Sequence, residues 1–132
     1  MRITADTNVL ARALTEDDQA QSRLAQAALA AADQVVITMP ALCELVWVLS
    51  RGYRVSARQI AETLRRLVAS ERVSVDAAAV ATGLAVFEAG GDFADGVIAH
   101  LGFEMEADAF VSFDARAVRA IETQGFAATL LR

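Results

Sequence analysis

Short apolar stretches alternate with longer amphipathic ones along the whole chain. Five of them are short and rich in β-branched residues or Leu, at residues 2–5, 34–38, 72–75, 109–112 and 127–131. Apolar positions follow one another in them without strict alternation, which is typical of strands covered on both faces. The pattern therefore predicts five strands in a mostly parallel sheet.

Between these stretches, apolar residues recur with helical spacing. Ile60, Leu64, Leu67 and Val68 fall on one helical face, and Ser56 with Gln59 forms a capping box before them. Further helices are expected near residues 80–87 and 94–101, and one should begin near Pro40. Alternating strands and helices predict an α/β fold with the sheet between helical layers. The length fits a single domain, residues 1–132.

Acidic residues stand where the predicted strands end or where the following helices begin. They are Asp6, Glu44, Asp92, Asp95 and Asp114. Functional sites of open parallel sheets form beyond the carboxyl ends of the strands, so we expect these carboxylates to be neighbours. Clustered carboxylates raise one another's pKa, and a hard divalent ion such as Mg²⁺ or Mn²⁺ relieves that repulsion. Metal-assisted attack of water on a phosphodiester is the chemistry that follows.

Each carboxylate also has a structural explanation. An aspartate after a strand often caps the next helix, and Asp92 with Asp95 could form such a cap by themselves. Asp114 is explained equally well as a cap or as a ligand. Glu44 differs because it interrupts the apolar stretch 41–49, where an unpartnered buried carboxylate is unfavourable. For Glu44 a functional role is therefore the favoured explanation.

Composition narrows the possible chemistry. All twelve basic residues are arginine, against seventeen acidic ones, for a formal charge of −5. The absence of lysine excludes Schiff-base and P-loop lysine mechanisms. Net acidity argues against nucleic-acid binding by bulk charge, yet Arg51, Arg54 and Arg58 begin an arginine-rich segment. They are candidates for RNA binding, although a solvated helix face explains them equally well.

Other residue types exclude further classes. The single cysteine, Cys43, cannot form an internal disulfide and indicates a reducing compartment, the cytoplasm. The single histidine, His100, makes a zinc site unlikely to form and is expected to be structural. Neither a long apolar span, a signal peptide nor a nucleotide-binding glycine motif is evident, so we expect no membrane association and no nucleotide cofactor. Trp47 and Phe103 are expected in the core or on a dimer surface rather than stacked on bases.

Four segments together resemble the PIN domain family, and most closely the VapC-type toxins of bacterial type II toxin–antitoxin pairs. These segments are Asp6-Thr7-Asn8-Val9-Leu10, residues 42–49 around Glu44, residues 92–99, and Ser112-Phe113-Asp114. The resemblance implies a three-layer α/β/α sandwich, Rossmann-like, around a central sheet of about five strands. It also implies an endoribonuclease that depends on Mg²⁺ or Mn²⁺.

Carried onto this chain, the resemblance assigns the metal-binding and catalytic positions to Asp6, Glu44, Asp95 and Asp114. It places Asp92 behind these ligands or at the helix cap, and Asn8 and Ser112 where they orient the first and fourth carboxylates. A homodimer and a cognate protein antitoxin are also implied, with Leu24, Leu29 and Trp47 as candidate contact surface. The alternatives are a non-catalytic PIN-type domain that binds RNA or protein, and a nuclease of ribonuclease-H type. The absence of a hairpin signal disfavours the latter.

Overall fold

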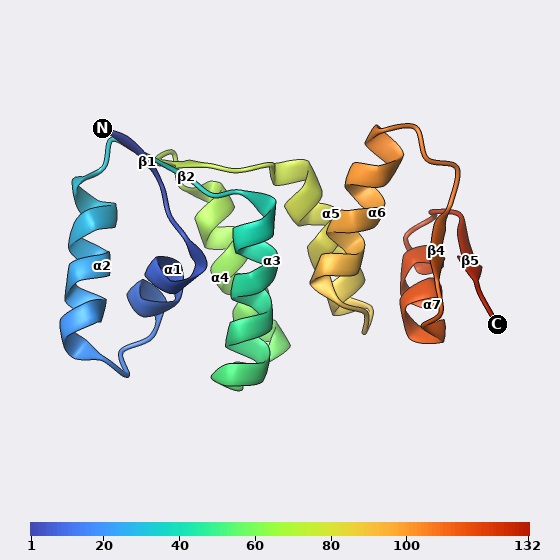
Figure 1. Ribbon diagram of the computed structural model, residues 1–132, viewed down its shortest axis with the longest axis horizontal. Helices are drawn as coiled ribbons and strands as arrows, with labels where there is room; N and C mark the ends of the chain where they lie inside the picture. The colour runs from blue at the N-terminus through green and yellow to red at the C-terminus, as the bar shows by residue number, and fades with distance from the viewer. The chain divides into compact units, whose positions relative to one another are not determined.

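The computed structural model describes residues 1–132 as two compact units, residues 1–76 and 77–132. The first unit begins with β1 (Arg2–Thr4) and two helices, α1 (Thr7–Leu14) and α2 (Gln19–Ala31). It continues with β2 (Gln34–Val36), α3 (Met39–Trp47), a π-helical turn η1 (Val48–Gly52), α4 (Ala57–Ala69) and β3 (Val73–Ser74). Figure 1 shows α1 lying between α2 and α3.

The first unit is built on a three-stranded parallel sheet in the order β1-β2-β3. Ile3 pairs with Val35, which pairs in turn with Val73. Beside this sheet, the helices bury their apolar residues almost completely, among them Leu10, Leu42, Leu45, Ile60 and Leu64. This burial fixes the faces of α1 and α3, and with them the directions of their polar side chains.

The second unit contains α5 (Ala77–Glu88), α6 (Phe93–Glu104), β4 (Phe110–Ser112), α7 (Ala115–Thr123) and β5 (Ala128–Leu130). Its two strands are parallel, with Phe110 opposite Ala128 and Ser112 opposite Leu130. Val86, Ala99, Ala120 and Ile121 form its core. At the edge of that core, the ring of Phe103 stacks on that of Phe126, with their centroids 5.1 Å apart.

Glycine allows the two longest helices of the second unit to pack closely. A Cβ added to Gly96 in α6 would lie 2.8 Å from the Cα of Gly83 in α5 and 3.0 Å from the carbonyl oxygen of Thr82. Real Cβ atoms do not approach backbone atoms so closely. Gly96 therefore sets the distance between α5 and α6, one residue after Asp95.

The predicted elements are present. All five strands lie within two residues of their expected bounds, all pairings are parallel, and the fold is α/β. Ser56 caps α4 by accepting a hydrogen bond from the backbone N–H of Gln59 at 3.2 Å. The pairings form one three-stranded and one two-stranded sheet, so the single five-stranded sheet and the three-layer arrangement stay predictions. No helix is long and apolar enough to span a bilayer.

Candidate functional site

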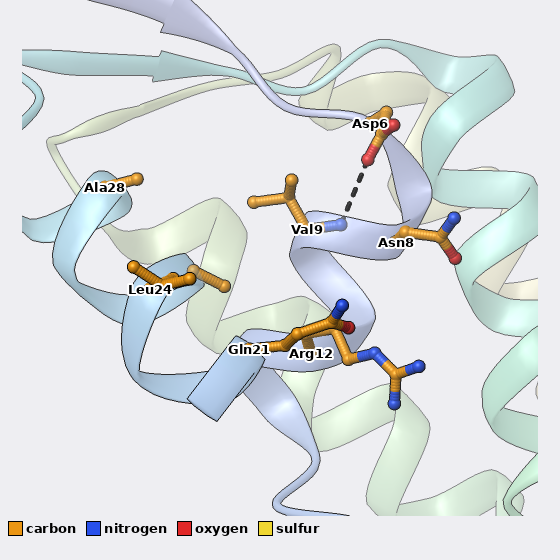
Figure 2. A pocket seen from close by; sticks show the side chains of 8 residues that line it. Asp6, Asn8, Val9, Arg12, Gln21, Leu24 and Ala28 are labelled. Atoms are coloured by element: carbon orange, nitrogen blue, oxygen red, sulfur yellow. Dashed lines mark hydrogen bonds between the residues drawn. The ribbon is translucent and has the colours of Figure 1, made fainter. Parts of the chain in front are cut away.

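Asp6 ends the first strand and caps the helix that follows. Its Oδ1 accepts a hydrogen bond from the backbone N–H of Val9 at 3.0 Å, as Figure 2 shows. The cap uses one carboxylate oxygen, and the side chain is exposed, so Oδ2 is left for another partner. The neighbouring Asn8 turns its amide away from Asp6 in the same view. Its role in orienting Asp6 stays a prediction.

Glu44 lies in α3 and is exposed, contrary to the burial inferred from its apolar surroundings. Leu42, Leu45 and Val46 point into the core, and helical geometry directs Glu44 to the opposite side. The hydroxyl of Thr7 donates a hydrogen bond of 2.7 Å to Glu44 Oε2 and also contacts the carbonyl of Ala41 at 3.4 Å. Thr7, the residue after Asp6, thus ties Glu44 to the start of α1. Sequence reasoning missed this role, although Thr7 stands in the motif that drew attention to Asp6.

A pocket of about 340 Å³ opens beside Asp6, between α1 and α2. Its polar lining consists of Asp6, Asn8, Arg12 and Gln21. Its apolar wall is formed by Val9, Leu24, Ala25 and Ala28, and Figure 2 shows Leu24 and Ala28 of α2 facing Val9 of α1. This mixed lining suits an amphipathic group of a ligand or partner, held next to an exposed carboxylate.

In the second unit, Asp92 and Asp95 lie at the start of α6. Asp92 occupies the N-cap position, but its side chain makes no capping hydrogen bond. The cap that would explain it structurally is therefore not formed. Asp95 is half-buried in the first turn, where burial first, and then the charges of Asp92 and Asp114, raise its pKa. The charges of Asp92 and Asp114 thus disfavour the ionised form of Asp95, which is unfavourable at neutral pH unless a cation is bound.

Asp114 follows β4 and caps α7. Its Oδ1 accepts hydrogen bonds from the backbone N–H groups of Arg116 at 2.9 Å and Ala117 at 3.4 Å. The N–H of Asp114 in turn donates to the hydroxyl of Ser112 at 2.9 Å. Ser112 therefore contacts the backbone of Asp114, and its role in orienting the Asp114 carboxylate stays a prediction. As at Asp6, both capping bonds go to one oxygen and leave Oδ2 available.

The carboxylates are thus distributed between the two units. Asp6 and Glu44 belong to the first, and Asp92, Asp95 and Asp114 to the second. No group of three or more Asp, Glu, His or Cys side chains in the structure is arranged to hold a metal ion. The donor chemistry fits Mg²⁺ or Mn²⁺, since every candidate ligand is a carboxylate oxygen and Asp95 carries unrelieved repulsion.

Comparison with known protein families decides the affiliation of the chain. Residues 3–122 match the PIN domain family, so the match covers nearly the whole length and includes all the carboxylates described above. The chain belongs to the PIN domain family. No curated protein and no solved structure matches it significantly. PIN domains are commonly nucleases, and such nucleases generally use divalent metal ions, which supports a hydrolase in general.

The arginines of this PIN domain are displayed on its surface. Arg51 in η1, Arg54 in the following loop and Arg58 in α4 are all exposed. Arg54 adopts a left-handed backbone conformation, with φ at 54°, as the chain reverses between η1 and α4. Arg58 forms an exposed ion pair with Glu62 at 3.5 Å, which holds it weakly. These cations remain available to phosphate.

Three other residues singled out in the sequence have distinct surroundings in the PIN domain. Cys43 is half-buried in α3, where burial raises the pKa of its thiol and makes it unreactive. His100 lies between α5 and α6: its Nδ1 is 2.9 Å from Thr82 Oγ1, and its Nε2 is 2.5 Å from Glu104 Oε1 without hydrogen-bond geometry. These contacts agree with a structural histidine. Trp47 is 64% exposed, so it does not lie in the core, and the other expected place, a dimer surface, stays a prediction.

Proposed function

We propose that this PIN domain is an endoribonuclease dependent on Mg²⁺ or Mn²⁺, and a VapC-type toxin. One observation carries the proposal: two aspartates at the ends of parallel strands are fixed through Oδ1 alone. Asp6 is held by the N–H of Val9, and Asp114 by the N–H groups of Arg116 and Ala117. Each carboxylate is thus oriented by its own helix and presents a second oxygen to solvent.

The roles of the residues follow from their contacts. Asp6, Glu44, Asp95 and Asp114 are proposed as the metal-binding and catalytic carboxylates, with Asp92 beside Asp95 and Ser112 behind Asp114. Thr7 keeps Glu44 in place through the 2.7 Å hydrogen bond. These carboxylate oxygens would hold the divalent ion, which when bound would supply a water molecule of lowered pKa and offset negative charge on the phosphate. Residues 1–132 are proposed to form one PIN domain, with a five-stranded sheet in an α/β/α sandwich.

A cleavage assay with purified protein tests the activity. We expect a short single-stranded RNA to be cut with Mg²⁺ or Mn²⁺, left intact with a chelator, and left intact by Asp6→Asn. Asp108→Asn is the matched control, because Asp108 is an exposed aspartate that is not among the proposed ligands, and it should cut normally. Equal cleavage by Asp6→Asn and the wild type would indicate a contaminant and refute the assignment.

The exposed arginines are proposed to hold the RNA strand. Arginine pairs bidentately with phosphate, and each phosphate contact adds to the salt dependence of binding. Reversing the charges with Arg54→Glu and Arg58→Glu should weaken RNA binding and flatten the slope of log Kd against log salt. An unchanged slope would remove this segment from the RNA-binding surface.

The toxin role adds partners to the proposal. A cognate protein antitoxin is proposed to seat an amphipathic segment in the pocket between α1 and α2, where it would cover Asp6. Induced expression of the wild type should arrest growth, and expression of Asp6→Asn should not. A cognate antitoxin should restore growth to cells that express the wild type. It should fail to do so with Leu24→Glu, which places a charge on the apolar wall of the pocket at a residue that is 72% exposed. Growth arrest that persists in Asp6→Asn would contradict the toxin role. A cytoplasmic location and a homodimer belong to the same proposal.

The alternative is a non-catalytic PIN-type domain that binds RNA or protein. It predicts RNA binding in the presence of metal with no cleavage, and no difference between Asp6→Asn and the wild type. The mutual repulsion of Asp95, Asp92 and Asp114 disfavours it, because a domain that binds no cation gains nothing from that arrangement.

A further inference from the structure

The aromatic side chains of the chain divide sharply by exposure. The sequence contains six Phe, one Trp and one Tyr. Six of these eight side chains are buried or half-buried, as in the stacked pair Phe103 and Phe126. The two exceptions are Trp47, 64% exposed, and Phe113, 79% exposed. Single exposed apolar side chains are common on protein surfaces, so the exposure of these two aromatics gains meaning only from the residues beside them.

Both exposed aromatics adjoin proposed catalytic carboxylates. Trp47 follows Glu44 by three residues in α3, which places the two side chains on one face of the helix. Phe113 stands directly between Ser112 and Asp114, in the turn that joins β4 to α7. Since Trp47 belongs to the first unit and Phe113 to the second, the same association of aromatic and acid occurs twice, independently.

We propose that Trp47 and Phe113 are platforms on which unpaired bases of the RNA stack, on nucleotides close to the scissile phosphate. The inference rests on the proposed nuclease function and adds to it two residues that bind the bases of the RNA. Every base has a π face, and stacking on an exposed aromatic ring is available only where the base is not already stacked in a duplex. The two aromatics would thereby select unpaired segments for cleavage.

The residues around Trp47 favour RNA over a protein partner. Its exposed neighbours on the same helical stretch are charged: Glu44 lies one turn before it, and Arg51 about one turn after it in η1. An aromatic ring flanked by an arginine is the combination with which proteins bind single strands, the ring contacting a base and the cation a phosphate. Acidic residues are depleted at the cores of protein–protein interfaces, so Glu44 on the same helical face disfavours a protein-docking patch centred on Trp47.

Trp47 reports directly on its own contact, because it is the only tryptophan in the chain. With chelator present to prevent cleavage, titration of a 12-nucleotide single-stranded RNA should quench its fluorescence. The same sequence as a duplex, and inorganic polyphosphate as a charge control, should quench it much less. Binding detected by the anisotropy of a labelled RNA without quenching would overturn the role of Trp47, while leaving the nuclease proposal to the cleavage assay.

Substitutions then separate stacking from charge. Trp47→Ala and Phe113→Ala should each raise the Kd for single-stranded RNA about tenfold and leave the salt slope unchanged, whereas Arg51→Gln should lower the slope. Trp47→Phe and Phe113→Tyr keep a ring and should restore most of the binding. Met105→Ala removes another exposed apolar side chain, 83% exposed and outside the site, and should bind normally.

Two outcomes would contradict the inference while the cleavage activity stands. One is that Trp47→Ala and Phe113→Ala bind and cleave single-stranded RNA like the wild type. The other is that Trp47→Ala changes the oligomeric state in light scattering without changing RNA affinity, which would make Trp47 a contact between copies of the chain. The converse result is that the wild type binds single-stranded RNA with quenching of Trp47 fluorescence and fails to cleave it when metal is added. That result would support the stacking role and refute the nuclease proposal.

Discussion

At the scale of the residue, a helix cap and a metal ligand are compatible roles for one aspartate. From the sequence, Asp6 and Asp114 had to be assigned to one role or the other. In the structure each cap uses Oδ1 and leaves Oδ2 available. The cap also fixes the carboxylate at the positive end of a helix dipole, where a negative charge is stabilised. A capping aspartate after a parallel strand therefore remains a candidate ligand.

The residue for which stability and function conflict most clearly is Asp95. Burial, followed by the charges of Asp92 and Asp114, raises its pKa in the folded chain. The folded state then holds the proton more tightly than the unfolded state, so stability falls as pH rises from the unfolded pKa through the folded one. Without metal at pH 7, Asp95→Asn should therefore raise the Tm, measured by thermal unfolding.

The pH dependence provides the check on this prediction. The gain from Asp95→Asn should disappear below about pH 4, near the unfolded pKa of an aspartate, because the wild-type side chain is then neutral as well. Asp108→Asn serves as the control and should leave the Tm unchanged at both pH values. If Asp95→Asn lowers the Tm at pH 7, the ionised Asp95 stabilises the folded state, and the prediction is wrong.

Residue-level prediction failed where side-chain direction mattered. Glu44 was recognised as unusual because it interrupts an apolar stretch, but the burial used to argue for it was wrong. Helical periodicity separates Leu42, Leu45 and Leu49 on the buried side from Glu44 and Trp47 on the exposed side. The hydrogen bond from Thr7 to Glu44 spans two helices, so no local pattern could have revealed it.

At the scale of the element, strands and helices were predictable and the distances between helices were not. The five strands follow from local composition, and the caps at Asp6, Asp114 and Ser56 from local residue type. Helix propensity by itself predicts only that Gly96 loosens its helix. In the structure it lies against Gly83, with no room for a methyl group between α5 and α6. Such a contact between distant residues is absent from any single-helix pattern.

Adding a methyl group in α6 should therefore have opposite effects at two positions. Gly96→Ala places a Cβ 2.8 Å from backbone and should destabilise the protein by about 1–3 kcal/mol. Gly102→Ala meets nothing closer than 4.0 Å and should stabilise it by about 0.5–1 kcal/mol through helix propensity. Denaturant unfolding measures both.

The two glycine variants also bear on function through Asp95. Because Gly96 is its immediate neighbour, Gly96→Ala should reduce RNA cleavage at a temperature where the variant is still folded, whereas Gly102→Ala should cleave normally. Full cleavage by a folded Gly96→Ala would show that Asp95 tolerates a displacement of α6.

At the scale of the whole molecule, the net charge has a local explanation. Setting aside Asp6, Glu44, Asp92, Asp95 and Asp114 leaves twelve acidic residues against twelve arginines. The formal charge of −5 therefore equals the charge of the proposed site. Net acidity first argued against nucleic acid, but it is concentrated in the carboxylates that the proposal gives to a metal ion, and arginines remain to contact phosphate.

The corresponding prediction is that the proposed ligands Asp6 and Asp95 both contribute to the binding of Mn²⁺. A ligand that binds only the folded state stabilises it by RT ln(1 + [L]/Kd), about 2.7 kcal/mol at a hundredfold excess over Kd. Mn²⁺ at that excess should raise the Tm of the wild type by several degrees. Asp6→Asn in the first unit and Asp95→Asn in the second should each abolish most of this shift, and Asp108→Asn should keep it. Were Asp6→Asn to retain the full shift while Asp95→Asn lost it, the ion would be held by the second unit alone, because no ligand from the first unit would then contribute to its affinity.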